Sequence, residues 1–443
     1  MKKYQSFSLQ NWRLIPQASS MEEKDRFAID VVGRVLPFKT NNYVTDELIR
    51  WDALQDDPIF TLNFPRREML VAEHFNQVER LMSEGNAAKL NDAVEKIRME
   101  LNPNPSGQDH NVPDFQGIRL HGLQHKYRET VLLFPRPGQT CHAYCTFCFR
   151  WPQFSGLPDM KFSIKGDYEL YIKYIQAHPK VTDILFTGGD PMVMSASLLR
   201  AHIEPMLSPA MKQIRNIRIG TKSLAYWPYR FTSDEDADDL IRLFDEVIRS
   251  GKHLSIMSHF NHPVELSTDA VKEAIYRIRN TGAQIRTQSP VLRHINDDPD
   301  IWAEMLRREV ELGCVPYYMF VARDTGAKHY FELPLAQCQT IFRKAYQKVS
   351  GICRTIRGPS MSDHAGKIQI LGVSEAGGEK LFVLRFIQGR KPDWVATPFF
   401  AKFSATATWF DQLEPAFGEK EFFFESELSS YLRDALERDT GAY

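Results

Sequence analysis

Residues 140–150 read Thr-Cys-His-Ala-Tyr-Cys-Thr-Phe-Cys-Phe-Arg, with Cys141, Cys145 and Cys148 in one short loop. Three thiolates held this close together can bind three irons of a cubane iron-sulfur cluster and leave the fourth iron open to an outside ligand. A zinc site and an electron-transfer cluster are the alternatives, but both usually need a fourth nearby Cys or His. His142 lies inside the loop, too tightly placed to complete a tetrahedron easily.

Around this loop, short β-branched or apolar runs alternate with amphipathic segments, which is the pattern of parallel βα units. Strands are predicted over 130–134, 183–187, 214–221, 253–259, 284–288 and 315–320. Helices are predicted over 168–177, 195–206, 234–250, 268–281, 298–312 and 336–349. In such α/β folds, ligand-handling side chains gather in the loops after the carboxyl ends of the strands. The cysteine loop directly follows the first predicted strand.

The six units occupy residues 111–350, and the two flanks differ from them in character. Residues 1–110 carry no chemical motif and are predicted to be a helical N-terminal extension, because residues 66–81 and 85–101 have apolar residues at helical spacing. Residues 351–443 are predicted to form an α+β C-terminal extension. Its expected parts are a loop over 352–366, a strand over 380–386, an aromatic-rich stretch that packs on the barrel or on a second subunit, and a helix over 422–436.

Composition excludes several classes of protein. With 43% hydrophobic and 25% charged residues, the 443-residue chain is neither disordered, collagen-like nor a coiled coil. A net charge of -1 gives no global attraction to nucleic acid or anionic lipid. No apolar run approaches the roughly 18 to 20 residues of a membrane span. We therefore expect a cytoplasmic protein, in which the scattered Cys314, Cys338 and Cys353 are small buried hydrophobes.

A glycine-rich turn ends the second predicted strand. Gly188, Gly189 and Asp190 follow it in the sequence Phe-Thr-Gly-Gly-Asp-Pro. Glycines let the backbone approach a ligand closely, and an acid beside them can receive a cationic amino group. An ordinary strand-to-helix turn is the alternative interpretation.

The C-x-x-x-C-x-x-C spacing, with an aromatic residue immediately before the third cysteine, resembles the radical S-adenosylmethionine (SAM) superfamily. The resemblance implies a 4Fe-4S cluster whose open iron is chelated by SAM. One electron from the cluster then cleaves SAM to a 5′-deoxyadenosyl radical, which abstracts a hydrogen atom from the substrate. It also implies that Gly188, Gly189 and Asp190 hold the amino group of SAM. The superfamily fold is a partial (βα)6 TIM-like barrel, which agrees with the six units.

Further segments occur in the order found in the lysine 2,3-aminomutase family, and the resemblance covers about residues 55–370. These segments are 125–127, 218–222, 258–263, 288–292, 296–297 and 316–318. The resemblance implies an isomerase that uses SAM, the cluster and pyridoxal 5′-phosphate (PLP) to move an amino group from the α to the β carbon of an amino acid. It also implies a flavodoxin- or ferredoxin-type reductant and a homo-oligomer.

The family resemblance carries roles to individual residues. Lys367 falls where the family has its PLP lysine, which we expect to be exposed on a flexible loop. Arg150 matches the arginine that pairs with the substrate α-carboxylate, and His259 and Gln288 match positions around SAM and PLP. Taken alone, these residues have ordinary alternatives: a surface lysine, a structural salt bridge and a core histidine.

Two departures concern the substrate. The lysine-specific enzymes place two aspartates around the substrate ε-ammonium, and here those positions hold Arg323, or Asp324 if the alignment slips by one, and Arg357. Cations at these positions would repel an ammonium side chain. We therefore expect Arg323 and Arg357 to bind an amino acid other than free lysine, such as glutamate or aspartate.

A third departure concerns PLP. A family arginine that helps to hold the PLP phosphate corresponds to Thr130, so Lys126 or Arg128 would have to supply the charge. A PLP-independent radical SAM enzyme on the same scaffold therefore stays open as an alternative, as does a lysine 2,3-aminomutase proper. A protein-lysine substrate is disfavoured by the same two arginines, and a non-catalytic iron-sulfur protein would not need the glycine turn.

Overall fold

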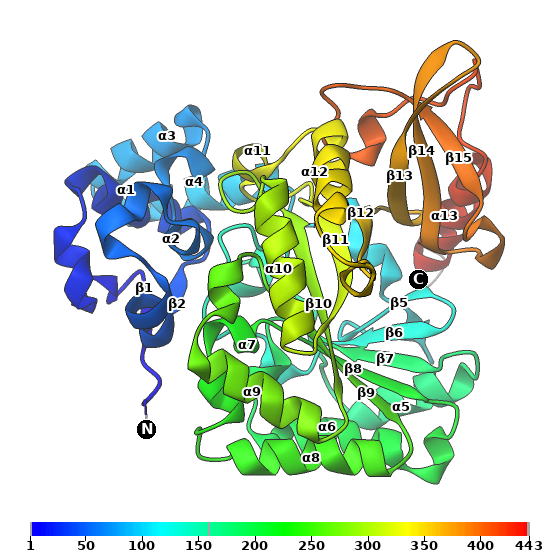
Figure 1. Cartoon of the computed structure of the whole chain (residues 1–443), viewed down its shortest axis with the longest axis horizontal. Helices are drawn as coiled ribbons and strands as arrows, with labels where there is room; N and C mark the ends of the chain where they lie inside the picture. Colours follow the sequence, from blue (N-terminus) through cyan, green and yellow to red (C-terminus); the bar gives the residue numbers. More distant parts are fainter. Residues whose placement is uncertain (1, 158–159, 441–443) are drawn as a thin grey trace.

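A mixed β-sheet of 11 strands runs through the molecule in the order β15-β14-β13-β12-β11-β10-β9-β8-β7-β6-β5 (Figure 1). The structure is a computed structural model that describes residues 2–157 and 160–440, with side chains at the C-terminal end described up to residue 433. Strands adjacent in the sheet are also adjacent in sequence. The chain is therefore a mixed α/β protein whose sheet grows strand by strand.

The middle of this sheet is parallel, and all six predicted strands are present in it. The parallel strands are β6 (Thr130–Leu133), β7 (Asp183–Phe186), β8 (Asn216–Thr221), β9 (His253–His259), β10 (Gln284–Val291), β11 (Val315–Val321) and β12 (Arg357–Ser362). At one edge, β5 (Leu123–Tyr127) pairs antiparallel with β6. At the other edge, β13 (Gly366–Ala376), β14 (Glu379–Gly389) and β15 (Pro398–Lys402) continue the sheet antiparallel.

The predicted helices connect these strands. They are α5 (Tyr168–Ala177), α6 (Ala196–Leu207), α8 (Ala237–Arg249), α9 (Asp269–Asn280), α10 (Pro299–Glu311) and α12 (Leu335–Gln347). Side-chain N-caps fix several starts: Asp167, Ser195, Thr268 and Asp298 each accept a hydrogen bond from a first-turn N–H. Figure 1 shows α10 and α12 in front of the strands that they join.

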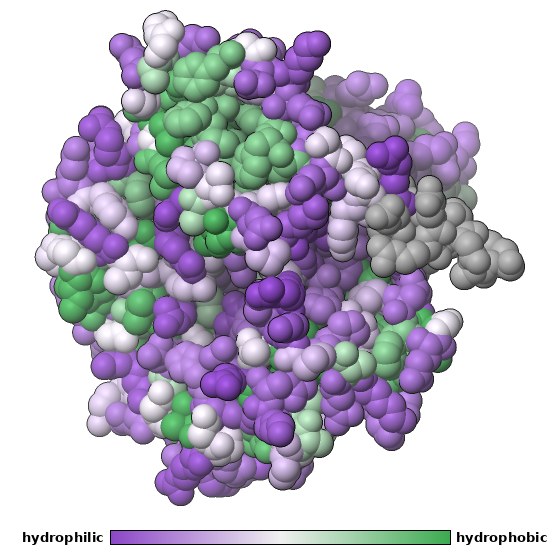
Figure 2. Space-filling view, turned by 90° about the vertical axis from the view of Figure 1, so that its right-hand side faces the viewer, coloured by the Kyte–Doolittle hydropathy of each residue, from purple (hydrophilic) through white to green (hydrophobic). Residues whose placement is uncertain are grey.

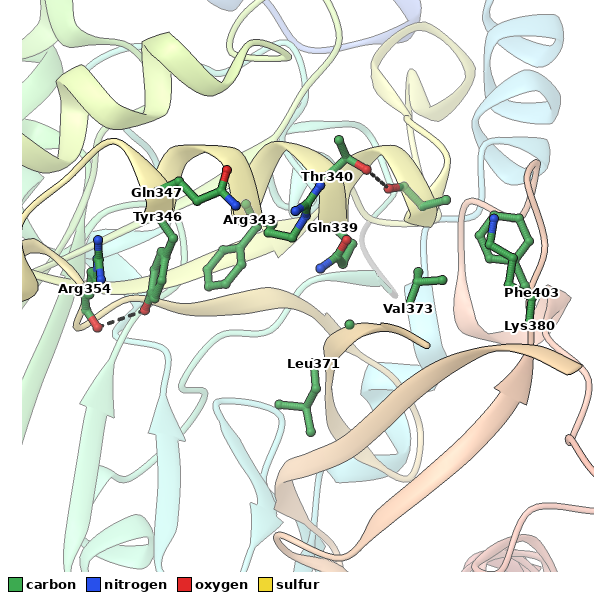
Figure 3. Close-up of a pocket in the computed structure, with 13 residues that line it drawn as sticks. Gln339, Thr340, Arg343, Tyr346, Gln347, Arg354, Leu371, Val373, Lys380 and Phe403 are labelled. Atoms are coloured by element: carbon green, nitrogen blue, oxygen red, sulfur yellow. Dashed lines mark hydrogen bonds between the residues drawn. The ribbon is translucent and has the colours of Figure 1, made fainter. Parts of the chain in front are cut away.

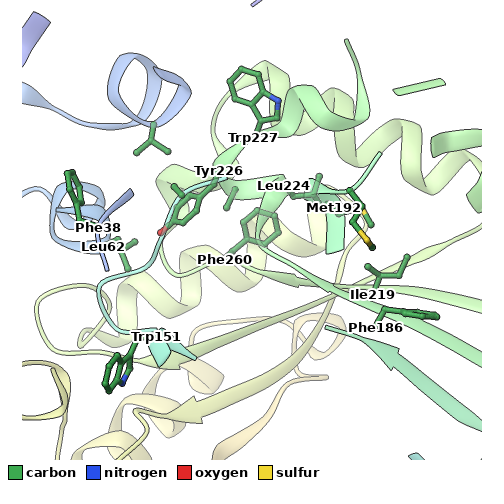
Figure 4. Close-up of a cluster of buried hydrophobic side chains, with 14 of the residues drawn as sticks. Phe38, Leu62, Trp151, Phe186, Met192, Ile219, Leu224, Tyr226, Trp227 and Phe260 are labelled. Atoms are coloured by element: carbon green, nitrogen blue, oxygen red, sulfur yellow. The ribbon is translucent and has the colours of Figure 1, made fainter. Parts of the chain in front are cut away.

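The N-terminal segment contributes helices and a small sheet. Its main elements are α1 (Glu23–Val35), α2 (Pro58–Asn63), α3 (Ala72–Ser83), α4 (Ala87–Glu100) and the antiparallel pair β1 (Ser6–Ser8) and β2 (Lys39–Asn41). The predicted helix over 66–81 starts later, at Ala72, because Leu70 and Val71 are extended. Buried residues of this segment belong to the same hydrophobic cluster as the parallel strands. Figure 4 shows Phe38 and Leu62 beside Tyr226 in that cluster.

The predicted loop over 352–366 is wrong in its middle, where strand β12 occupies Arg357–Ser362. Glycine and proline made the segment look irregular, but Gly358 serves close packing between strands: a Cβ there would lie 2.4 Å from the carbonyl oxygen of Met319 on β11. Pro359 also lies inside the strand, and residues 358–361 are buried. A strand therefore runs where the composition indicates a loop, and Lys367 lies on the next strand.

The aromatic-rich stretch packs as part of the C-terminal region. Trp394, Phe399 and Trp409 are buried in a cluster that also contains Val321 of β11 and Leu335 of α12. This packing on the parallel part of the fold is one of the two arrangements expected from the sequence. The last helix, α13 (Glu425–Thr440), overlaps most of the helix predicted over 422–436.

The side of the molecule shown in Figure 2 is largely hydrophilic, with a broad group of hydrophobic side chains towards the top and smaller groups elsewhere. Phe400 and Phe417 contact each other near the far end of the β13–β14 hairpin and remain 38% and 46% exposed. Among the described residues, no helix has the length and apolar character needed to cross a bilayer.

Candidate active site

A cavity of about 290 Å³ lies at the carboxyl ends of the parallel strands, where the sequence places the ligand-handling loops. It brings together most of the predicted site residues: Cys141, Cys145, Cys148, Arg150, Gly188, Gly189, Asp190, His259, Gln288, Arg323 and Lys367. Lys126 and Arg357 are predicted site residues that do not line it. Segments more than 200 residues apart in sequence thus meet in one chamber.

The three clustered cysteines are free, partly buried and exposed to this cavity. Burial raises the pKa of Cys148 to about 12, and it also raises the pKa values of Cys141 and Cys145. Buried thiolates therefore need a compensating metal centre or cation beside them. Within the described part of the chain, no three His, Cys, Asp or Glu side chains are arranged to hold a single metal ion. A cubane cluster makes a different demand, because it takes each thiolate on a separate iron.

The two glycines of the 188–190 turn are required by the cysteine loop. A Cβ on Gly188, whose φ is +143°, would lie 2.2 Å from Nε2 of Gln139, and one on Gly189 would lie 2.4 Å from the Thr140 carbonyl oxygen. Both glycines also line the cavity. The sequence attributes them to a close approach of ligand, whereas the structure shows that they first allow two loops of the protein to meet.

The Asp190 carboxylate is hydrogen-bonded to several groups of the protein. Its buried carboxylate accepts hydrogen bonds from Thr221 Oγ1 at 2.7 and 2.8 Å, from Ser223 Oγ at 3.0 Å, and from the backbone N–H groups of Met192 and Lys222 at 2.9 and 2.8 Å. These bonds use the acceptor capacity of a carboxylate. This side chain therefore ties the turn to the end of β8, and its contact with a ligand amino group stays a prediction.

His259 and Gln288 form a pair across β9 and β10. The Nε2 atoms of the two side chains are 2.6 Å apart, so the Gln288 amide donates to an unprotonated ring nitrogen. Burial and the nearby Lys222 ammonium lower the pKa of His259 to about 3. The imidazole is therefore neutral at physiological pH and serves the cavity as a hydrogen-bonding group without charge.

Two guanidinium groups share one aromatic ring at the cavity wall. The Cζ atoms of Arg150 and Arg323 lie 4.9 and 5.1 Å from the centre of the Phe149 ring. Nη1 of Arg150 is buried without a hydrogen-bond partner, and no acidic side chain pairs with Arg150 among the described residues. Arg323 has Asp324 beside it, with 3.8 Å between Nε and Oδ1, and it donates from Nη2 to the Pro105 carbonyl oxygen at 3.1 Å. An unpaired buried guanidinium is costly, so this wall is built to receive an anion.

Lys367 lies on strand β13 rather than on the expected flexible loop. Its register partner is Ser362 of β12, which also lines the cavity, while the next residue, Ile368, points into the hydrophobic core. The Nζ atom lies 3.9 Å from the centre of the Tyr318 ring. Burial lowers the pKa of Lys367 well below its usual value, and the charges of Arg218 and other neighbouring cations lower it further.

Relatives of known name resemble most of the chain. A proposed L-lysine 2,3-aminomutase of Aquifex aeolicus is 29% identical over 389 residues, which cover 88% of this chain and 91% of the relative. The L-lysine 2,3-aminomutases of Methanococcus maripaludis and Escherichia coli are 25% and 26% identical over 68% and 52% of this chain, and over 58% and 63% of their own lengths. The chain is thus similar to L-lysine 2,3-aminomutases over most of its length.

Other comparisons are weaker than these. No protein-family model matches this chain. Similar solved structures include a radical SAM methyltransferase from Sphaerobacter thermophilus, with a TM-score of 0.36, 13% identity and coverage of 53% of this chain and 68% of that one. Streptococcus suis SuiB bound to S-adenosylmethionine has a TM-score of 0.35, 11% identity and coverage of 62% and 57%. Both solved structures are only distantly similar to this chain.

The strand contacts of Thr130 lead to a cation that lines the cavity. Oγ1 of Thr130 donates to Asp183 at 2.8 Å, and Asp183 forms an ion pair with Arg218, whose side chain lines the cavity. Arg218 alternates along β8 with the buried Ile217 and Ile219. Sequence reasoning did not give Arg218 a role at the site, although this alternation was a signal that it faces away from the core.

The two predicted cations outside the cavity lining are beside it. Arg357 stacks on Tyr317 and Tyr318, with its Cζ atom 4.2 and 4.3 Å from the ring centres, so its contact with substrate stays a prediction. Lys126 donates to the Asp363 carbonyl oxygen, and burial lowers its pKa to about 7. Arg128 is exposed and pairs with Glu129, so it supplies no charge to the site.

A second hollow, of about 730 Å³, lies between α12 and β13 (Figure 3). It contains none of the predicted site residues. Its lining is Ala336, Gln339, Thr340, Phe342, Arg343, Tyr346, Gln347, Arg354, Leu371, Gly372, Val373, Lys380 and Phe403. The chemistry-bearing residues of the sequence therefore gather in the smaller cavity at the strand ends.

Proposed function

We propose that this chain is a radical SAM aminomutase that moves an amino group from the α to the β carbon of an amino acid other than free lysine. The proposal includes a 4Fe-4S cluster on Cys141, Cys145 and Cys148, PLP on Lys367, and a flavodoxin- or ferredoxin-type reductant. We further propose that the parallel strands and their helices form a partial (βα)6 TIM-like barrel, with an extension at each end of the chain. The observation that carries it is the cavity that joins the three thiols to Lys367 and to the guanidinium groups of Arg150, Arg218 and Arg323.

The described residues fit the implied groups. Three cysteines with no fourth protein ligand beside them match a cluster with one open iron. A lysine whose pKa is lowered by burial and by neighbouring cations matches a residue that must be neutral to bond PLP. Arg218 stands close enough to depress that pKa, and its guanidinium, already paired with Asp183, is the cation that we propose for the PLP phosphate. When bound, the cluster and SAM supply a hydrogen-abstracting radical, and PLP carries the migrating amino group.

Arg150 and Arg323 support a substrate with two anionic groups. Arg150 is placed to grip the α-carboxylate, which fixes the substrate relative to the cysteine loop two residues away. Arg323 presents a second guanidinium on the same Phe149 ring, where a side-chain carboxylate would neutralise it. The only acid in the cavity lining is Asp190, whose oxygens are already bonded. Glutamate or aspartate therefore fits this chamber better than lysine.

Covalent capture of PLP tests the proposal. The anaerobically purified protein is incubated with PLP, reduced with borohydride and digested, and we expect the pyridoxyl group on Lys367. Because its pKa is depressed, the neutral amine forms at lower pH than in an ordinary lysine. The rate of PLP attachment should thus rise with pH and level off below the usual lysine pKa of about 10.4.

Lys222 is the internal control for this capture. It lines the same cavity, but its ammonium bonds Asn261 at 2.7 Å and Glu265 at 2.6 Å, so it should stay unlabelled. Absence of label on Lys367, with the cluster present and SAM still cleaved, would show PLP-independent radical chemistry on this scaffold instead.

Arg323→Met tests the nature of the substrate. Removing one partner of a buried charge pair costs about 2 kcal/mol or more. We therefore expect kcat/KM for an acidic amino acid to fall at least about thirty-fold. The value for a neutral amino acid of similar size should change much less. The readout is a panel of glutamate, aspartate, glutamine and lysine.

Arg357→Met is the matched control in the same panel. Arg357 stacks on Tyr317 and Tyr318 outside the cavity lining, so its loss should leave the ratio between acidic and neutral substrates unchanged. If Arg357→Met shifts this ratio and Arg323→Met does not, the assignment of the side-chain pocket to Arg323 is wrong.

A further inference from the structure

One lysine of the N-terminal segment reaches the cysteine loop. Lys39, on strand β2, donates from Nζ to the carbonyl oxygen of Cys141 at 2.7 Å. Its own carbonyl oxygen accepts from the backbone N–H of Tyr144 at 2.7 Å. The residue therefore holds the loop from both its backbone and its side chain, across a sequence separation of 102 residues.

The ammonium of Lys39 has no acidic partner among the described residues. It contacts the Cys141 carbonyl oxygen and the rings of Tyr4 and Tyr144, whose centres lie 6.0 and 5.7 Å from Nζ. Two aromatic faces can stabilise a cation without neutralising it. The positive charge is thus directed at the loop that carries the thiols.

The surrounding contacts fix this ammonium in place. Asn41, two residues further along β2, donates to the His142 carbonyl oxygen at 3.2 Å and to that of Tyr226 at 2.9 Å. Tyr4 donates from its hydroxyl to the same His142 carbonyl oxygen at 2.7 Å. Phe38, next to Lys39, is buried in the cluster shown in Figure 4. Because these contacts hold the Lys39 ammonium in place, its distance from the cysteine loop stays constant, and the surroundings need not reorganise when charge changes nearby.

We propose that Lys39 raises the reduction potential of the cluster held by Cys141, Cys145 and Cys148, as a positioning residue that does not touch substrate. The inference rests on the proposed function for the presence of that cluster. One electron passes from the low-potential flavodoxin- or ferredoxin-type reductant to the cluster, which changes from the 2+ to the 1+ state. The reduced state carries one more negative charge, so a fixed cation beside it favours reduction.

Three substitutions separate charge from hydrogen bonding. Lys39→Gln removes the charge and keeps an N–H donor, Lys39→Met removes both, and Lys39→Arg keeps both. The cluster potential is measured by redox titration monitored by EPR, without SAM or substrate. We expect Lys39→Gln and Lys39→Met to lower the equilibrium constant for one-electron reduction about tenfold, which corresponds to about 59 mV. Lys39→Arg should restore the wild-type potential.

Lys252→Met is the matched control. Lys252 also bonds backbone carbonyls, those of Ile214 at 2.6 Å and Met211 at 3.3 Å, and these lie outside the cavity lining. Its loss should leave the potential unchanged. A Lys39→Gln potential equal to that of the wild type would overturn the inference alone. A wild-type protein without any 4Fe-4S signal would overturn the proposed function and this inference together.

Discussion

Cys145→Ala is expected to abolish both cluster assembly and SAM cleavage. Cys145 lies between the other two cysteines of the loop and lines the cavity with them, 3.5 Å from the Tyr226 hydroxyl. Two remaining thiolates leave a second iron without a protein ligand, so the cubane loses its anchor. Iron and sulfide content, the visible absorption of the reconstituted protein and the yield of 5′-deoxyadenosine measure the result. Both properties should fall to background.

Cys338→Ala is the matched control for this substitution. Cys338 is fully buried on α12, and burial raises its pKa to about 12, as it does for Cys148. It therefore shares the chemistry of a buried thiol without facing the cavity. The control should bind the cluster as the wild type does. Retention of SAM cleavage by Cys145→Ala would contradict the assignment of the cluster to these cysteines.

Arg150→Ala is expected to remove turnover while leaving the cluster intact. The guanidinium lies over Phe134 and Phe149, at 4.7 and 4.9 Å from their ring centres, and has no acidic partner in the described chain. Breaking a buried ion pair costs about 3 to 5 kcal/mol. We thus expect kcat/KM to fall at least about a hundredfold. Steady-state kinetics and the EPR spectrum of the reduced cluster measure the two effects.

Arg150→Lys distinguishes charge from geometry at this position. An ammonium retains the positive charge but cannot grip a carboxylate with two parallel hydrogen bonds. Activity should recover only in part. An unchanged apparent affinity for substrate in Arg150→Ala would remove the carboxylate role, and loss of the cluster spectrum would show that Arg150 supports the loop instead.

The sequence predicts the parallel strands and the cysteine loop well, for a physical reason. Parallel strands covered by helices are buried on both faces, so they form apolar runs such as residues 183–187 that stand out from amphipathic helices. The cysteine spacing is local, so no knowledge of the fold is needed to find it. Both signals lie within a few residues of chain.

Features that depend on register are predicted less well. Arg357 and Lys367 are ten residues apart in one region, yet only Lys367 lines the cavity, because β12 and β13 turn alternate side chains to opposite faces. The polar and apolar alternation of residues 360–362 and 367–370 was a signal for these strands. Glycine and proline nearby obscured it.

Long-range contacts are absent from any local pattern. The five hydrogen bonds of Asp190 come largely from residues more than 30 positions away, and the bond from Lys39 to the cysteine loop spans 102 positions. A single sequence shows the residue types but not these partners. The contacts of Asp190 and Lys39 are therefore seen only in the folded chain.

Because Lys367 lies on a regular strand, the face to which its side chain points depends on whether an odd or an even number of residues is added before it. Along β13 its side chain faces the cavity and the next one, Ile368, faces the core. One residue inserted between β12 and Lys367 would turn the amine into the hydrophobic core, and two would turn it back. Additions at the exposed Gly377–Gly378 end of the hairpin leave this count untouched. The hairpin can thus vary in length at its tip, while the short connection at its base must keep its number of residues.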